Sequence, residues 1–324
     1  MTPVRLQSNQ PMIHYLYLGR VDYGEALRLQ QELVALRTEQ RIGNVLLLLE
    51  HPPVLTLGRN ARRANVLASD DLLASRGVTL YEINRGGDVT YHGPGQLIGY
   101  PIFDLRSLHN EKGARLGPVD FVRLIEEALI RVCAEFSVPT GRICGLTGVW
   151  CSAVGSLADS GPSDKGCDSS HNRAEGAVRP TEGGKIAAIG IHVARGVTSH
   201  GFALNVTTDL RDFQLINPCG ITDRPVTSLE REVANPKSLP GLEDLAHRAA
   251  RQFGQVFNQQ VLALENLDAL RTHARSVGPG QETPAPESAA PESRAQEFPA
   301  EDTPLQVPPE IDRLRRAKPR PVSA

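Results

Sequence analysis

Three segments of the chain carry apolar side chains at the three- and four-residue spacing of an amphipathic helix. This periodicity predicts helices over residues 22–40, 118–136 and 242–257. The first segment opens with an Asp-x-x-Glu pattern that resembles a capping box. The second opens with Pro118, which suits the first turn of a helix.

Short apolar runs, bounded by turn residues, lie between these helices. They are rich in Val, Ile, Leu and Tyr, which is typical of strands. The predicted strands are residues 13–18, 44–50, 54–58, 78–83, 97–103, 185–193 and 200–206. The strands cluster before and after the helix at 118–136 and do not alternate strictly with helices. This pattern favours an α+β fold, with helices on one face of a sheet, over a doubly wound α/β fold.

Two stretches of the chain show neither period. Residues 152–184 are rich in Gly, Ser and Asp, which predicts a flexible insertion within the domain. Residues 275–324 hold 10 of the 24 prolines, which predicts a disordered tail. The sequence therefore predicts one folded domain over residues 1–274, followed by a Pro-rich tail.

The composition narrows the class of protein. The chain has 324 residues and a net charge of −2, with 40% hydrophobic and 22% charged residues, as in a globular protein. So small a net charge offers no long-range attraction to nucleic acid or to an anionic membrane. No apolar run reaches the ~18 residues of a membrane span. The five cysteines are odd in number and irregularly spaced, and no export signal is visible. We therefore expect a reduced, cytoplasmic chain without a zinc site.

The segment RGGDVTYHGPGQLIGYPI, residues 85–102, holds five glycines and two prolines beside Arg85, Asp88, Tyr91 and His92. Glycines here would let a ligand approach the backbone closely. Their spacing matches neither the dinucleotide-binding nor the phosphate-binding glycine motif. A hairpin with a long loop explains the glycines equally well, and the cluster of polar side chains favours a binding loop.

Two further residues are candidates for chemistry. Lys185 is one of five lysines and begins a predicted strand of small apolar residues. Partial desolvation there would ease the loss of its proton; the alternative is a strand-end lysine that extends to solvent. Cys219 lies in a Pro-Cys-Gly turn that can present a nucleophilic thiolate to a cleft, although most free cysteines are simply buried apolar residues.

Six motifs, taken in this order, resemble the lipoyl(octanoyl) transferases over about residues 12–235. They are EHPPVLTLGR (50–59), RGGDVTYHGPGQLIGYPI (85–102), TGVW (147–150), GGKIAAIGIHV (183–193), SHGFALNV (199–206) and NPCGI (217–221). The resemblance implies a mixed sheet with packed helices, similar to the catalytic domains of biotin and lipoate protein ligases.

The resemblance also implies an acyltransferase that moves an octanoyl group from octanoyl-acyl carrier protein to a lysine of a lipoyl domain. Cys219 would carry the group as a thioester, with Lys185 as its partner. The implied acceptors are the lipoyl domains of 2-oxoacid dehydrogenase acyltransferase subunits and the glycine cleavage H protein. No cofactor and no metal are expected, and neither nucleic acid nor a membrane is an expected partner. The residues implied to bind the acyl substrate are Arg85, Gly86, Gly87, Asp88, Val89, Thr90, Tyr91, His92, Ala188, Ile189, Gly190, Gly201, Phe202 and Ala203.

Two other functions stay open at this point: an ATP-dependent lipoate or biotin ligase of the same fold, and a non-catalytic lipoyl-domain binding protein. A ligase that activates a free acid as an acyl-adenylate has no use for a cysteine at position 219, so the NPCGI motif favours the transferase. The presence of both Lys185 and Cys219 argues against a protein that only binds. His92 and His200 follow the family motifs, and either positioning or direct catalysis fits them.

Overall fold

The computed structural model describes residues 12–110, 113–151, 183–217 and 225–276. These residues fall in one compact unit, residues 1–283. The predicted insertion (152–184) and the predicted tail (275–324) lie outside the described residues, apart from two residues of each. Both therefore stay predictions.

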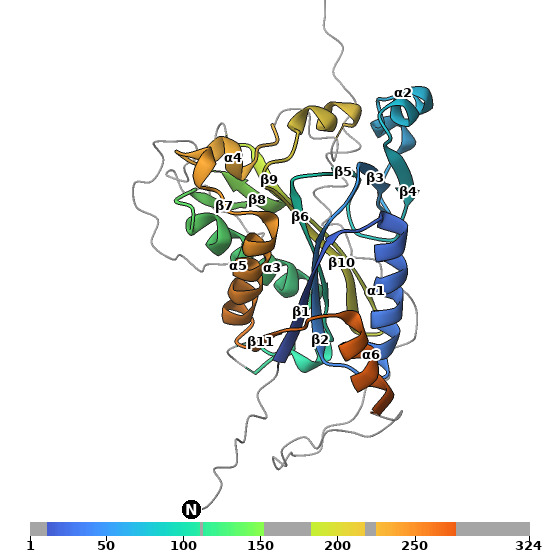
Figure 1. The fold of residues 1–324 in the computed structure, drawn as a ribbon, viewed down its shortest axis with the longest axis vertical. Coiled ribbons are helices and arrows are strands. Elements are labelled where there is room, and N and C mark those ends of the chain that lie inside the picture. The colour runs from blue at the N-terminus through green and yellow to red at the C-terminus, as the bar shows by residue number, and fades with distance from the viewer. Residues whose placement is uncertain (1–11, 111–112, 152–182, 218–224, 277–324) are drawn as a thin grey trace, which may run out of the picture. The chain divides into compact units, whose positions relative to one another are not determined.

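A mixed sheet of eight strands forms the centre of the fold (Figure 1). Its strands are β1 (Met12–Arg20), β2 (Asn44–Glu50), β6 (Gln96–Ile102), β7 (Thr140–Ile143), β8 (Leu146–Cys151), β9 (Lys185–Ala194), β10 (Val197–Asn205) and β11 (Gln260–Ala263). They lie in the order β11-β1-β2-β6-β10-β9-β8-β7. β1 runs parallel to both of its neighbours, and the other neighbouring strands are antiparallel.

Helices cover both faces of this sheet. α3 (Pro118–Ala134) and α5 (Leu242–Val256) pack on one face, whereas α1 (Tyr23–Thr38) and α6 (Leu267–Ser276) pack on the other (Figure 1). The mixed sheet with packed helices is confirmed, but the expectation that the helices lie on one face is wrong. The reason is that every residue of β2 and β6 is buried, and strands without a solvent-facing side need cover on both faces.

A second sheet holds three strands, β3 (Val54–Leu57), β4 (Thr79–Glu82) and β5 (Val89–His92), in the order β4-β3-β5. Its apolar side chains pack with α2 (Asp70–Ser75) and with the 3-10 helix Leu210–Leu215. β5 lies within the segment that the sequence predicted to be a loop. Because β5 belongs to the small sheet and β6 to the large one, the turn of residues 93–95 connects the two sheets.

The three predicted helices and all seven predicted strands are confirmed, with small shifts at their ends. Asp22 caps α1, since its side chain accepts hydrogen bonds from the backbone N–H groups of Gly24 (2.8 Å) and Glu25 (3.2 Å). The strands and α-helices that the sequence did not predict are short, with ten residues at most; they are β5, β7, β8, β11, α2, α4 (Leu229–Glu232) and α6. None of the described helices is both long enough and apolar enough to cross a membrane.

Candidate active site

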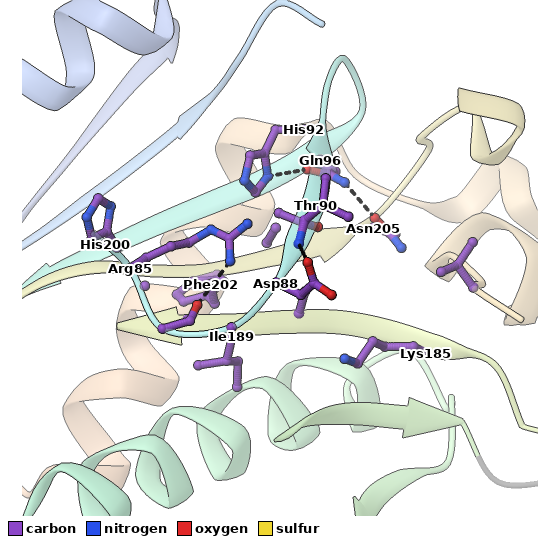
Figure 2. Close-up of a pocket in the computed structure, with 18 of the residues that line it drawn as sticks. Arg85, Asp88, Thr90, His92, Gln96, Lys185, Ile189, His200, Phe202 and Asn205 are labelled. Atoms are coloured by element: carbon purple, nitrogen blue, oxygen red, sulfur yellow. Dashed lines mark hydrogen bonds between the residues drawn. The ribbon is translucent and has the colours of Figure 1, made fainter. Parts of the chain in front are cut away.

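A cavity opens where residues 85–92, which we call the loop wall, face residues 185–190 of β9, which we call the strand wall (Figure 2). The empty space within the cavity and its open mouth, solvent included, is about 820 Å³. Apart from Tyr91, every residue that the sequence assigned to the acyl pocket lines it, and so does Lys185. The lining residues are Tyr23, Arg85, Gly86, Gly87, Asp88, Val89, Thr90, His92, Gln96, Tyr100, Lys185, Ala188, Ile189, Gly190, His200, Gly201, Phe202, Ala203, Asn205, Phe213 and Val226.

Tyr91 is not among the residues that line the cavity. Side chains alternate along a strand, so on β5 Tyr91 points away from the side of Thr90 and His92. The side chain is buried, its hydroxyl donates to Asp212 Oδ2 (2.7 Å), and its ring meets Phe213 edge-on with centroids 5.6 Å apart. Burial, reinforced by the carboxylate, raises the pKa of Tyr91 well above its usual value. Tyr91 therefore attaches β5 to the 3-10 helix 210–215, a structural role that the sequence did not indicate.

Arg85 holds the shape of the loop wall from within. Its side chain is 8% exposed. Arg85 Nη2 donates to the backbone oxygen of Thr56 (2.7 Å) and to Thr56 Oγ1 (2.9 Å), and Nη1 donates to the carbonyl oxygen of Gly86 (3.0 Å). A buried guanidinium needs such partners, so these bonds anchor the loop to β3.

The glycines of the loop wall allow the loop to lie directly on β9. Gly86 N–H donates to the carbonyl oxygen of Ile191 (2.9 Å). A Cβ on Gly190 would lie 2.7 Å from the Gly86 carbonyl oxygen, and Gly87 has a φ of +91°, which L side chains rarely adopt. These glycines are therefore required by packing within the protein, before any ligand is considered.

His92 and His200 are buried and neutral. Burial is the main cause that lowers the pKa of each imidazole to about 3, and the positive charge of Arg85 adds to the effect. His92 Nδ1 lies 3.1 Å from Gln96 Oε1, and His200 Nε2 lies 2.7 Å from Asn84 Oδ1. Since an amide oxygen only accepts, these ring nitrogens carry the proton. Such an arrangement suits positioning better than proton exchange.

A chain of buried amides links the loop wall to the start of β9. Gln96 Nε2 donates to Asn205 Oδ1 (2.9 Å; Figure 2), and Asn205 Nδ2 donates to the backbone oxygen of Thr227 (2.9 Å). Thr227 N–H in turn donates to the backbone oxygen of Lys185 (3.0 Å). Gln96 and Asn205 line the cavity but were not predicted to do so. Each is a polar residue next to an apolar run, Gln96 before LIGYPI and Asn205 after FAL. A polar residue in such a place was the sign in the sequence that could have indicated a role in the site.

Lys185 reaches the cavity from the first residue of β9. Its Nζ lies 5.0 Å from the ring centroid of Trp150, the residue paired with it on β8. Gly148 makes room for the side chain, since a Cβ there would lie 2.8 Å from Lys185 Cε. The half-buried ammonium thus lies over an aromatic face, a favourable cation–π arrangement, and the side chain contributes to the cavity lining.

The backbone beside Lys185 is held by a buried carboxylate. Glu126 is fully buried, and its Oε1 accepts a hydrogen bond from Gly148 N–H (3.0 Å). Its Oε2 pairs with Arg123 (2.7 Å) and with Arg142 (3.1 Å). With both oxygens engaged, the carboxylate fixes the strand on which the lysine side chain rests.

Cys133 and Cys151, two buried cysteines, are poor nucleophiles. Burial raises the pKa of the Cys133 thiol to about 12 and also raises that of Cys151, so neither forms a thiolate near neutral pH.

Cys219 lies outside the described residues, which break off at Asn217 and resume at Pro225. Asn217 N–H donates to the backbone oxygen of Asn65 (2.7 Å), and the backbone oxygen of Pro225 accepts a hydrogen bond from Lys185 N–H (2.8 Å). The residues at both ends of this segment are therefore anchored, one of them to Lys185 itself.

The cavity combines an apolar surface with polar groups at its ends. Figure 2 shows Ile189 and Phe202 between His200 at one end and Lys185 at the other. Apolar side chains of this kind suit an alkyl chain, and an amine that can exchange a proton suits acyl transfer to or from such a chain.

The chain is similar to known proteins over most of its length. Residues 22–254 match the family described as the lipoyl protein ligase A/B catalytic domain. The octanoyltransferase of Acidobacterium capsulatum is 58% identical over 257 residues, which cover 79% of this chain and 94% of that protein. The octanoyltransferase of Koribacter versatilis is 51% identical over 259 residues, which cover 80% of this chain and 90% of that protein.

Solved structures share the fold at low sequence identity. A bi-partite lipoate protein ligase from Thermoplasma acidophilum aligns with a TM-score of 0.50 and 14% identity, covering 82% of this chain and 91% of that chain. LipL1 from P. falciparum, in complex with lipoate, aligns with a TM-score of 0.51 and 10% identity, covering 85% of this chain and 76% of that chain. At such identities the likeness concerns the fold alone.

Proposed function

Because the chain belongs to the lipoyl protein ligase A/B catalytic-domain family and is an acyltransferase, we propose that it transfers an octanoyl group from octanoyl-acyl carrier protein to a lysine of a lipoyl domain. The acceptors in this proposal are the lipoyl domains of 2-oxoacid dehydrogenase acyltransferase subunits and the glycine cleavage H protein. The Thermoplasma ligase, which was studied with its E2 lipoyl domain, supports an acceptor of this kind.

The observation that carries the proposal is the place of Lys185. Its side chain borders a cavity with apolar walls, and its backbone N–H is bonded to Pro225. Pro225 follows the segment that contains Cys219, and Val226, the next residue, lines the cavity. This supports Cys219 as the nucleophile and Lys185 as its proton-exchange partner.

In the first half-reaction, the Cys219 thiolate attacks the carbonyl carbon of the octanoyl thioester. The tetrahedral intermediate collapses, the bond to the carrier sulfur breaks, and the Lys185 ammonium gives its proton to the departing thiolate. One thioester replaces another, so no external energy and no cofactor enter. The products are the free carrier thiol, an octanoyl thioester on Cys219 and a neutral Lys185.

In the second half-reaction, the neutral amine of the acceptor lysine attacks the same carbonyl carbon. Lys185 takes the proton that the attacking nitrogen loses, and the Cys219 thiolate departs. An amide bond forms and the thioester bond breaks. The thiolate and the ammonium are restored, and because each stabilises the other they titrate as a coupled pair.

The octanoyl chain in this proposal lies along the strand wall. Ile189 and Phe202 supply its apolar contacts, together with Ala188, Gly201 and Ala203. The loop wall covers the chain from the other side. The neutral imidazoles of His92 and His200 add no charge of their own where they line the cavity.

The test is the mass of the intact protein after mixing with octanoyl-acyl carrier protein in the absence of ATP. We expect the wild-type chain to gain one octanoyl group and Cys219→Ala to gain none. Cys133→Ala, which removes a free buried cysteine, is the control and should be acylated like the wild type. Transfer to a lipoyl domain by Cys219→Ala at the wild-type rate would reject the covalent route. Product that forms only with ATP and free octanoate would identify a ligase instead.

A further inference from the structure

Asn65, the last residue of the 3-10 helix Arg63–Asn65, contacts two segments that are far apart in the sequence. Its side-chain Nδ2 donates to Asp88 Oδ2 in the loop wall (2.6 Å). Its backbone oxygen accepts a hydrogen bond from Asn217 N–H (2.7 Å). One residue therefore joins the cavity wall to the chain two positions before Cys219.

These two contacts depend on different parts of Asn65. The backbone contact continues a short ladder, in which Val66 and Ile216 form an antiparallel bridge and Leu67 N–H donates to the Leu215 oxygen (2.9 Å). This ladder needs no particular side chain. The link to the loop wall comes from the Asn65 amide, and because its acceptor is a carboxylate the bond is charge-assisted and strong.

Asp88 is itself held in a defined place. Its Oδ1 accepts a hydrogen bond from Val89 N–H (2.7 Å), and its backbone oxygen accepts one from Gly58 N–H (3.2 Å). The two carboxylate oxygens therefore connect the start of β5 to Asn65. A shift of Asn65 would be passed on to the loop wall and to Asn217 together.

We propose that Asn65 is a positioning residue whose side chain fixes Asn217, two residues before Cys219 in the sequence, relative to Asp88 in the loop wall. It acts through these two residues and does not touch the reacting atoms. The inference rests on the proposed function in one respect, namely that Cys219 carries the acyl group. Since misplacing a reacting group by about 1 Å can cost about 100-fold in rate, the side-chain link affects the acylation step more than the binding of the donor.

The experiment measures single-turnover formation of the octanoyl-enzyme from octanoyl-acyl carrier protein. Asn65→Ala should slow this step about 10- to 100-fold, while the KM for the carrier protein stays close to that of the wild type. Asn60→Ala is the matched control. Asn60 is exposed and lies five residues before Asn65 in the sequence. It contacts the loop wall through its backbone N–H, which donates to the carbonyl oxygen of Gly87 (3.1 Å). It should acylate at the wild-type rate.

A reciprocal exchange separates positioning from a general contribution to folding. Asn65→Asp sets a second carboxylate against Asp88 and should be slower than Asn65→Ala. Adding Asp88→Asn reverses donor and acceptor, re-forms the hydrogen bond and should restore most of the rate. The inference is overturned if Asn65→Ala acylates at the wild-type rate, or if the double variant is no faster than Asn65→Asp.

The wild-type protein distinguishes this inference from the proposed function. If it gains no octanoyl mass, the covalent route fails, and the variants are then compared by steady-state octanoylation of a lipoyl domain. An unchanged steady-state rate in Asn65→Ala would overturn the positioning role in that case as well. The melting temperature of each variant, measured alongside, shows whether a slow rate accompanies loss of folded protein.

Discussion

The two walls of the cavity are built in different ways. In the loop wall, polar side chains are bonded to the protein: Arg85 to Thr56, and His92 to Gln96. The strand wall is made of small and branched apolar residues, and its charged side chain, Lys185, rests half-buried on an aromatic ring. The comparison separates groups that define the shape of the site from a group that can exchange a proton within it.

The largest effect should come from the strand wall. Replacing Lys185 with Ala should slow both half-reactions by about 10²- to 10⁴-fold, the usual contribution of a positioned acid or base. Lys185→Arg keeps the positive charge but cannot release a proton near neutral pH, so it should be slow as well. Quenched-flow measurement of acyl-enzyme formation and of transfer to a lipoyl domain tests both variants. Wild-type turnover in Lys185→Arg would assign this side chain to binding alone.

In the loop wall, Arg85 should affect stability first. Arg85→Met leaves the buried Thr56 and Gly86 oxygens without their donor, and we expect the free energy of unfolding to fall by about 2–4 kcal/mol. Urea unfolding measures the change. The control is Arg59→Met, an exposed position in the neighbouring segment, which should cost little. A loss as small in Arg85→Met as in Arg59→Met would contradict a shape-defining role for the loop wall.

The buried histidines should make stability, and not the catalytic rate, depend on pH. The pKa of His92 and of His200 is lowered to about 3, chiefly by burial, from about 6.5 in an unfolded chain. Below about pH 6.5 the imidazoles bind protons in the unfolded state but not in the native state. The free energy of unfolding therefore falls as the pH falls towards 4, and these groups do not change it above about pH 7. Each imidazole should cost about 2 kcal/mol at pH 5.

Urea unfolding between pH 8 and pH 5 tests this expectation. His92→Gln should reduce the pH dependence by about one proton, whereas His109→Gln, at an exposed histidine, should leave it unchanged. A rate profile that follows the ionisation of His92 between pH 5 and pH 8 would place this side chain with the groups that exchange protons, and the contrast between the walls would fail.

Most of the cavity lining could be predicted because it comes in short continuous stretches of unusual composition. Residues 85–92, 188–190 and 201–203 lie in motifs that stand out from the surrounding chain. Lys185 stood out because lysine is rare here and seldom begins a strand of small apolar residues. In these cases the residues of unusual composition are also neighbours in the sequence, so a short segment is enough to identify them.

The remaining features depend on contacts between distant segments. Tyr23 lines the cavity from α1 and follows no motif of the loop. Tyr91 was expected to line the acyl pocket, but it does not line the cavity. The strand β5, on which neighbouring side chains point to opposite sides, was not predicted. The sequence pattern predicted helices on one face of the sheet, although the uninterrupted apolar run of β2 is typical of a strand that is covered on both faces. Asn65 has no local signal, since its partners are 23 and 152 residues away.

Trp150 is the single tryptophan of the chain, and its buried ring lies 5.0 Å from Lys185 Nζ. Indole emission responds to the charge and polarity of its immediate surroundings. The protein therefore carries one intrinsic optical probe, with no second indole to dilute its signal, at the end of the cavity where proton exchange is proposed. Binding of a ligand in the cavity and deprotonation of Lys185 can therefore be followed in real time, in unlabelled protein, as changes in a single fluorescence signal.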